Sequence, residues 1–130
     1  MGKQRYVDTK FWSDSYIINR EPLERYLFLY FLTNEHTNIA GIYELPIGVM
    51  ARETGLSISQ IAEILPRLKS KIHYLQVLDD DAEETSAWIY IKNFAKHQQV
   101  NDKIKKGIDA VMDNLPTKIK KELIKVGLKL

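Results

Sequence analysis

The feature that most constrains the fold is the pattern of helix boundaries between residues 46 and 68. Pro46 suits the first position of a helix, and Gly55 suits the left-handed residue that ends one. Ser57 and Gln60 then match a capping box, in which the Ser57 hydroxyl accepts from the Gln60 amide and the Gln60 side chain returns the bond. Two short helices joined by a tight turn are therefore predicted.

The second of these helices is predicted to have one buried face. Its apolar side chains recur at i, i+3, i+4 and i+7, the spacing of a helix face that packs on a core: Ile61, Ile64, Leu65 and Leu68. The opposite face is expected to carry Ser59, Glu63, Arg67 and Ser70. Pro66 has no N–H to donate to the carbonyl of Ala62, so we expect a kink or an early stop there.

Two segments after this helix pair have the composition of β-strands. Residues 73–78 and 87–91 are rich in β-branched, aromatic and leucine side chains, and they should pair as a hairpin. Residues 79–86 contain five acidic side chains, which predicts an exposed, mobile tip. Ahead of the helix pair, residues 41–43 predict one further short strand.

Helices are also predicted on both sides of this region. Pro22 and Glu24 mark the start of an apolar helix that should run to about Thr33 and form the core, and a short helix is expected after Asp8. Near the end of the chain Thr117 can cap a last short helix. Before it lies an apolar stripe that could dock on the rest of the chain or pair with a second copy, and its members are the candidate oligomer interface: Ile104, Ile108, Val111 and Leu115.

The order of these elements predicts a fold class. A helix, a short strand, a helix-turn-helix pair and a hairpin follow one another as in a winged helix-turn-helix. With 130 residues, of which 45% are apolar, the chain can form one core and not two. We therefore expect a mainly α protein with a small β-hairpin: a winged-helix domain over residues 1–98 and a basic amphipathic helical extension over residues 99–130.

Charge is segregated along the chain, although the formal net charge is only +2. Residues 72–91 carry five acidic and no basic side chains, whereas residues 92–130 carry ten lysines and four acidic side chains. A basic tail of this kind favours an acidic partner such as nucleic acid. A solvated, lysine-rich helix face is an equal alternative on charge alone.

Composition also excludes several classes of protein. The chain has no cysteine, so it can hold no disulfide, thiolate zinc site or cysteine nucleophile. Its apolar runs are far shorter than the roughly 20 residues of a membrane-spanning helix. We therefore expect a cytoplasmic protein that has no membrane partner.

Several segments resemble the amino-terminal domain of phage replisome organisers, the DnaD-like replication-initiation family. The most specific pieces are the Thr-Asn…Gly-Ile-Tyr stretch within residues 33–43 and the Lys-Asn-Phe…Lys-His-Gln stretch within residues 92–98. The match continues over residues 8–12, 22–30 and 105–108. This resemblance implies a winged-helix domain that binds DNA or self-associates at a replication origin, with other replication proteins as further partners.

In a helix-turn-helix, the second helix of the pair enters the major groove, where its outward residues reach base edges and basic side chains hold phosphates. The candidate DNA-binding residues on and after this helix are Ser59, Gln60, Arg67, Lys69 and Lys71. The tail adds Lys103, Lys105 and Lys106. The partner is expected to be double-stranded DNA, with single strands as an alternative, and the protein is expected to form a homo-oligomer.

Other interpretations stay open at the level of sequence. The acidic tip at residues 79–84 would repel phosphates, which favours either an unusual docking mode or a winged helix that contacts only proteins. A phage transcription regulator would have the same fold. No nucleophile motif, phosphate loop or metal-ligand spacing is present, since His36, His73 and His97 lie far apart, and we expect neither an enzyme nor a cofactor or metal.

Overall fold

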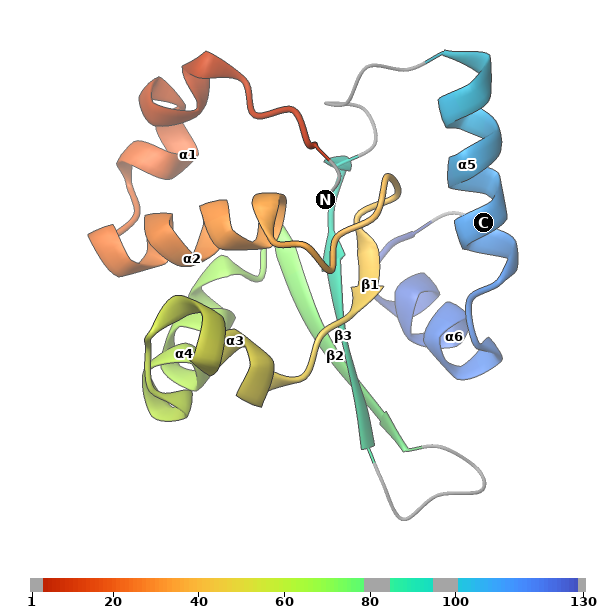
Figure 1. Ribbon diagram of the computed structural model, residues 1–130. Helices are drawn as coiled ribbons and strands as arrows, with labels where there is room; N and C mark the ends of the chain where they lie inside the picture. The colour runs from red at the N-terminus through yellow and green to blue at the C-terminus, as the bar shows by residue number, and fades with distance from the viewer. Residues whose placement is uncertain (1–3, 79–84, 95–100, 129–130) are drawn as a thin grey trace.

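The computed structural model describes residues 4–78, 85–94 and 101–128. It is mainly helical, with a small antiparallel sheet at its centre (Figure 1). The helical elements ahead of the sheet's last two strands are η1 (Thr9–Ser13), α1 (Ser15–Ile18), α2 (Pro22–Thr33), α3 (Ile47–Thr54), α4 (Ile58–Ile64) and η2 (Leu65–Leu68). The strands are β1 (Ile42–Glu44), β2 (Ile72–Leu78) and β3 (Thr85–Ile91), and α5 (Asp102–Asp113) and α6 (Thr117–Lys125) follow.

The helix pair α3 and α4 forms where its boundary residues predict. Gly55 ends α3 in the left-handed region with a φ of 79°. Both bonds of the capping box are present: the Gln60 amide donates to Ser57 Oγ over 3.1 Å, and the Ser57 amide donates to Gln60 Oε1 over 2.9 Å. Pro46 caps α3 from the position before its first residue, one place earlier than predicted.

The α-helix stops early at Pro66, which is one of the two predicted outcomes. α4 is α-helical to Ile64, and the chain then tightens into the 3₁₀ turn η2, in which Pro66 occupies one of the first two positions. A 3₁₀ turn avoids the hydrogen bond that proline cannot donate. All four predicted core residues of this segment are buried: Ile61, Ile64, Leu65 and Leu68.

The sheet is larger than the predicted two-stranded hairpin. β1 pairs with β3, so the strand order is β1-β3-β2 and all pairs are antiparallel. Thr85 and Ser86 belong to β3, opposite Leu78 and Val77, which makes the connection shorter than predicted. The predicted acidic tip at residues 79–84 lies outside the described residues. β1 has only 3 residues, and its sequence does not reveal which strand it will join.

The sheet is buried on both of its faces. One face packs on α2, α3 and α4 in a core that contains Leu27, Phe31, Met50, Ile61 and Ile89. The other face packs on α6 in a second cluster that contains Ile42, Leu75, Tyr90, Ile119 and Leu123. Consecutive residues of β3 alternate between the two clusters, as side chains of a pleated strand must.

The carboxy-terminal helices therefore do not form a separate arm. α6 covers the sheet face opposite the helix pair (Figure 1), and its Ile119 and Leu123 are fully buried. The predicted cap at Thr117 is wrong, because Pro116 takes the cap position and no side-chain cap bond forms. α5 begins with a cap that the sequence analysis did not predict: Asn101 Oδ1 accepts from the Ile104 amide over 2.9 Å.

The candidate oligomer stripe on α5 is divided by this packing. Leu115 is buried inside the chain, in the cluster under α6. Ile104, Ile108 and Val111 are part-exposed. Only the last three have surface that a second copy could contact.

Within the described ranges, the helices are too short or too polar to cross a lipid bilayer.

Candidate nucleic-acid interface

The outer face of α4 is the surface on which base-reading residues are predicted. Ser59, Gln60 and Glu63 are exposed there, and Ile58 adds an apolar side chain that is 52% exposed. The face is accessible because α4 packs on the core only through its opposite side. These four residues offer few hydrogen-bond donors to a base edge, and none of them is a cation.

Gln60 is restrained by its own helix cap. Its Oε1 accepts from the Ser57 amide, which leaves only Nε2 to donate elsewhere. Reading adenine with a glutamine requires both the oxygen and the nitrogen of the side-chain amide. Gln60 can therefore make a bidentate base contact only if the capping box opens.

Arg67 forms an ion pair with a buried carboxylate, although its own side chain is half exposed. Its Nη1 donates to Glu24 Oε2 over 3.2 Å, and the Glu24 side chain is only 6% exposed. Arg20 approaches the other Glu24 oxygen at 3.9 Å, and Arg67 also reaches Glu63 at 3.5 Å. The structure thus gives Arg67 a role that the sequence analysis did not predict, as a partner of a buried charge.

Lys69 and Lys71 are both exposed, beyond the end of η2. The Lys71 ammonium lies 5.7 Å from the centre of the Tyr16 ring, and the Arg20 guanidinium lies 4.9 Å from the same ring. Cations at such distances are attracted to the face of an aromatic ring. The structure therefore brings basic side chains from two distant parts of the sequence together at one end of the helix pair.

The tail lysines of the predicted interface lie elsewhere. Lys103, Lys105 and Lys106 belong to α5, which lies across the sheet from α4 (Figure 1), whereas Lys69 and Lys71 follow η2. The basic side chains of α5 are matched in number by acidic ones: Asp102, Asp109 and Asp113. The lysine excess is instead on α6, at Lys118, Lys120, Lys121 and Lys125, against the single acid Glu122.

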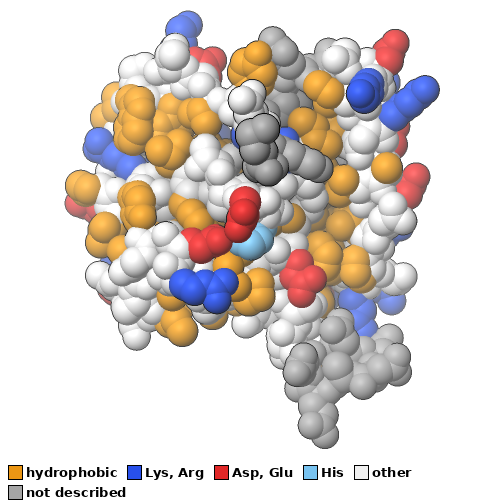
Figure 2. Space-filling model, in the orientation of Figure 1, with side chains coloured by type: hydrophobic (Ala, Val, Ile, Leu, Met, Phe, Trp, Pro, Cys, Tyr) orange, Lys and Arg blue, Asp and Glu red, His pale blue; other side chains and the backbone are white. Residues whose placement is uncertain are grey.

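The surface view agrees with this division. On the face shown in Figure 2, Lys and Arg side chains form separate small groups, and acidic side chains lie between them. This face therefore carries local groups of cations and not one continuous basic surface.

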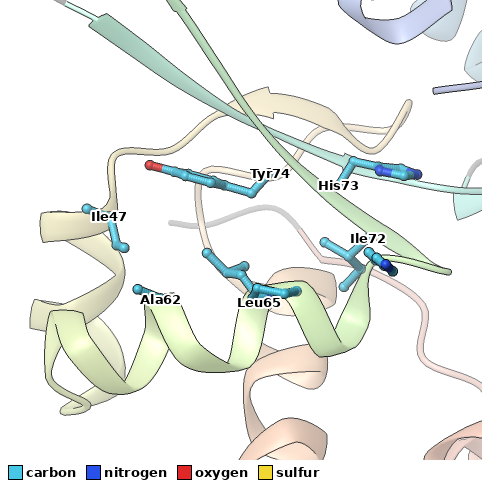
Figure 3. A pocket seen from close by; sticks show the side chains of 8 residues that line it. Ile47, Ala62, Leu65, Ile72, His73 and Tyr74 are labelled. Atoms are coloured by element: carbon cyan, nitrogen blue, oxygen red, sulfur yellow. The ribbon is translucent and has the colours of Figure 1, made fainter. Parts of the chain in front are cut away.

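A mostly apolar groove of about 280 Å³ lies between the helix pair and β2. The labelled side chains of Ile47, Ala62, Leu65 and Tyr74 border it, while the His73 ring points away (Figure 3). Lys69 also lines the groove. β2 is an edge strand of the sheet, so the groove follows an unpaired strand edge.

His73 packs against the sheet. Its ring stacks on Tyr90 with 5.8 Å between centres and 17° between planes. Burial lowers the pKa of His73, and the nearby Lys92 ammonium lowers it further. Both effects favour the neutral form of the ring.

A cluster of ionisable side chains that the sequence analysis did not find joins the loop after α2 to α3. Tyr30 donates from its hydroxyl to Glu53 Oε1 over 2.6 Å, and His36 Nε2 lies 3.1 and 3.0 Å from the two Glu53 oxygens. These bonds lower the pKa of Glu53, the tyrosine bond most of all, whereas burial opposes the shift. Glu35 lies beside them. The adjacent pair Glu35-His36 was the only signal in the sequence, because Glu53 is brought in by the fold.

The sequence matches no protein-family model and no curated protein, and the fold matches no solved structure.

Proposed function

We propose that this chain is a DNA-binding winged-helix protein of the replication-initiation type. The observation that carries the proposal is the order of elements along the chain, which is α2, β1, α3, α4, β2 and β3. The three strands of this series form one sheet of order β1-β3-β2. A helix pair closed by a glycine turn and followed by a hairpin is the framework of the winged helix. The DnaD-like segments add the replication context.

In the proposed complex, the exposed face of α4 lies toward the major groove. Ser59 and Gln60 are near the start of the helix, where a recognition helix contacts base edges. Lys69 and Lys71 lie beyond its far end and would bind phosphates of the flanking backbone. Because Gln60 and Arg67 are engaged within the protein, most of the affinity would come from phosphate contacts and little from base reading.

This distribution predicts weakly sequence-specific binding with a strong salt dependence. Each phosphate that a lysine neutralises releases counterions, and it contributes about 0.9 to the slope of log affinity against log salt. Lys69 and Lys71 should together account for a slope of nearly 2 on this basis. Lys105 and Lys106 should account for less, because aspartates share the surface of α5.

The test is a fluorescence-anisotropy titration of the protein with random and origin duplexes and with single strands, at several salt concentrations. Lys69→Ala/Lys71→Ala should weaken binding to all sequences and flatten the salt dependence, and Lys105→Ala/Lys106→Ala should do both to a smaller extent. Preference for the origin duplex would favour replication initiation over transcription regulation. An absence of salt-sensitive binding in the wild-type protein would overturn the DNA proposal.

A second candidate function is a protein-interaction module of a replication complex, without direct DNA contact. The observation that favours it is the part-exposed apolar surface of α5, at Ile104, Ile108 and Val111. A homo-oligomer or a replication partner could cover that surface. Ile108→Glu should then dissociate the assembly, as measured by light scattering, and an unchanged mass in solution would count against this interface.

A further inference from the structure

We propose that Glu35, His36 and Glu53 form a binding site for a divalent transition-metal ion of the zinc class. The imidazole and the two carboxylates each offer a donor atom, and all three donors lie within 4.8 Å of one another. Two of the donors come from the loop after α2 and one from α3, the first helix of the helix pair. A bound ion would therefore connect that loop to the helix pair.

The distances suit a shared ion. Zinc bonds of about 2.0–2.2 Å place the donor atoms of one coordination sphere about 3–3.5 Å apart. His36 Nε2 already lies 3.0 and 3.1 Å from the two Glu53 oxygens. Glu35 is exposed in the turn that follows α2, so its carboxylate can close the remaining gap by side-chain rotation. Water would occupy the rest of the coordination sphere.

The two better-placed ligands are oriented by neighbours that bind no metal themselves. The His36 amide donates to Asn34 Oδ1 over 2.9 Å, and Asn34 Nδ2 donates to the Tyr43 hydroxyl over 2.9 Å. Tyr43 is buried and donates in turn to the Phe31 carbonyl over 2.8 Å. The His36 backbone is therefore fixed to the core through an asparagine and a buried tyrosine.

Glu53 is oriented by Tyr30. The tyrosine hydroxyl donates to one carboxylate oxygen, which leaves the second oxygen free of that bond. Hydrogen bonds of this kind fix the direction of metal ligands and raise metal affinity. The Glu53 side chain is 25% exposed, so an ion can reach it from solvent.

The ligand chemistry selects the class of ion. Imidazole suits zinc, copper, nickel and cobalt, whereas magnesium and calcium prefer an all-oxygen shell. The two carboxylates give the site a negative charge that a divalent cation balances. The charged group that faces the cluster is Arg52, which acts on Glu53.

The experiment is calorimetric titration of the full, tag-free chain with Zn²⁺ at pH 7.5, and with Mg²⁺ in parallel. One ion should bind per chain, with a micromolar or tighter dissociation constant for Zn²⁺ and no comparable binding of Mg²⁺. Excess Zn²⁺ should raise Tm by several degrees, because it binds only the folded arrangement. Co²⁺ should report the same site through its visible absorption.

Variants make the test specific to these residues. His36→Ala should weaken Zn²⁺ binding about tenfold or more, and Glu35→Gln should weaken it without changing Tm in the absence of metal, since Glu35 is exposed. Glu44→Gln, an exposed glutamate on β1, is the matched control and should bind as the wild type does. The proposal is overturned if Zn²⁺ does not bind, or if it binds His36→Ala and wild type equally. It is also overturned if Mg²⁺ binds as tightly as Zn²⁺.

Discussion

Arg67 provides the sharpest test of the distinction between a DNA contact and a structural role. Its guanidinium is one of two cations that compensate the buried Glu24 carboxylate, at 3.2 Å, while Arg20 lies at 3.9 Å from the other oxygen. Arg67→Ala would leave that carboxylate with one cation, the more distant Arg20, and with the Glu21 amide, which donates to Oε1 over 3.4 Å. The variant should therefore be less stable than the wild type, whether or not the protein binds DNA.

The expected magnitude follows from the burial of the two partners. Removing one member of a fully buried pair costs about 3–5 kcal/mol, because the remaining charge is left in a poor environment. Here the Arg67 side chain is 51% exposed and Arg20 remains, so solvent screening reduces the effect to about 1–2 kcal/mol. For a domain of this size that corresponds to a fall in Tm of about 4–8 °C.

The assay is thermal and urea unfolding of Arg67→Ala, Glu24→Gln and the double variant. The double variant should recover part of the loss, because it removes the buried charge together with its partner. Glu63→Gln is the control, since its partner bond is exposed and should be worth less than about 0.5 kcal/mol. If Arg67→Ala were as stable as the wild type and lost only DNA affinity, the structural role assigned to Arg67 would be refuted.

Three further predictions concern other parts of the fold. Ile119→Ala should destabilise the protein by about 2–4 kcal/mol in urea unfolding, because the side chain is fully buried between α6 and the sheet; a loss below about 0.5 kcal/mol would mean that α6 does not dock. Gly41→Ala should lower Tm more than Gly55→Ala does. Both glycines have a positive φ, but at Gly41 the new methyl group would also lie 2.5 Å from the Phe94 side chain. Equal falls in Tm would contradict this packing. Tyr30→Phe should remove the hydrogen bond that lowers the pKa of Glu53, and with it a contribution to the free energy of unfolding. That contribution is present above the ordinary carboxyl pKa and is lost as the pH falls through the lowered pKa of Glu53. Stability curves of the two proteins that run parallel between pH 2 and pH 6 would disprove that link.

Local signals in the sequence predicted the helix pair well. Ser57 and Gln60 form their capping box, and Pro66 ends the α-helix, because each effect depends on atoms within a few residues. Gly55 likewise has the left-handed conformation that its position requires. The predicted DNA-binding residues describe their surface less well, because a sequence shows which side chains are cationic but not which acidic groups they contact. Arg67 was selected for its charge, and only the fold brings it to Glu24.

Interactions between near neighbours in the sequence set most of the helices and strand segments of this protein and the boundaries of the helix pair. Only the tertiary structure determines which of those elements contact one another. It added β1 to the sheet, placed α6 on the second face, separated the α5 lysines from those beyond η2, and brought Glu53 to His36. The physical reason is the range of the interactions. Caps, turns and amphipathic spacing are set by neighbouring residues, whereas strand pairing, helix docking and buried charge compensation depend on contacts between residues far apart in the chain.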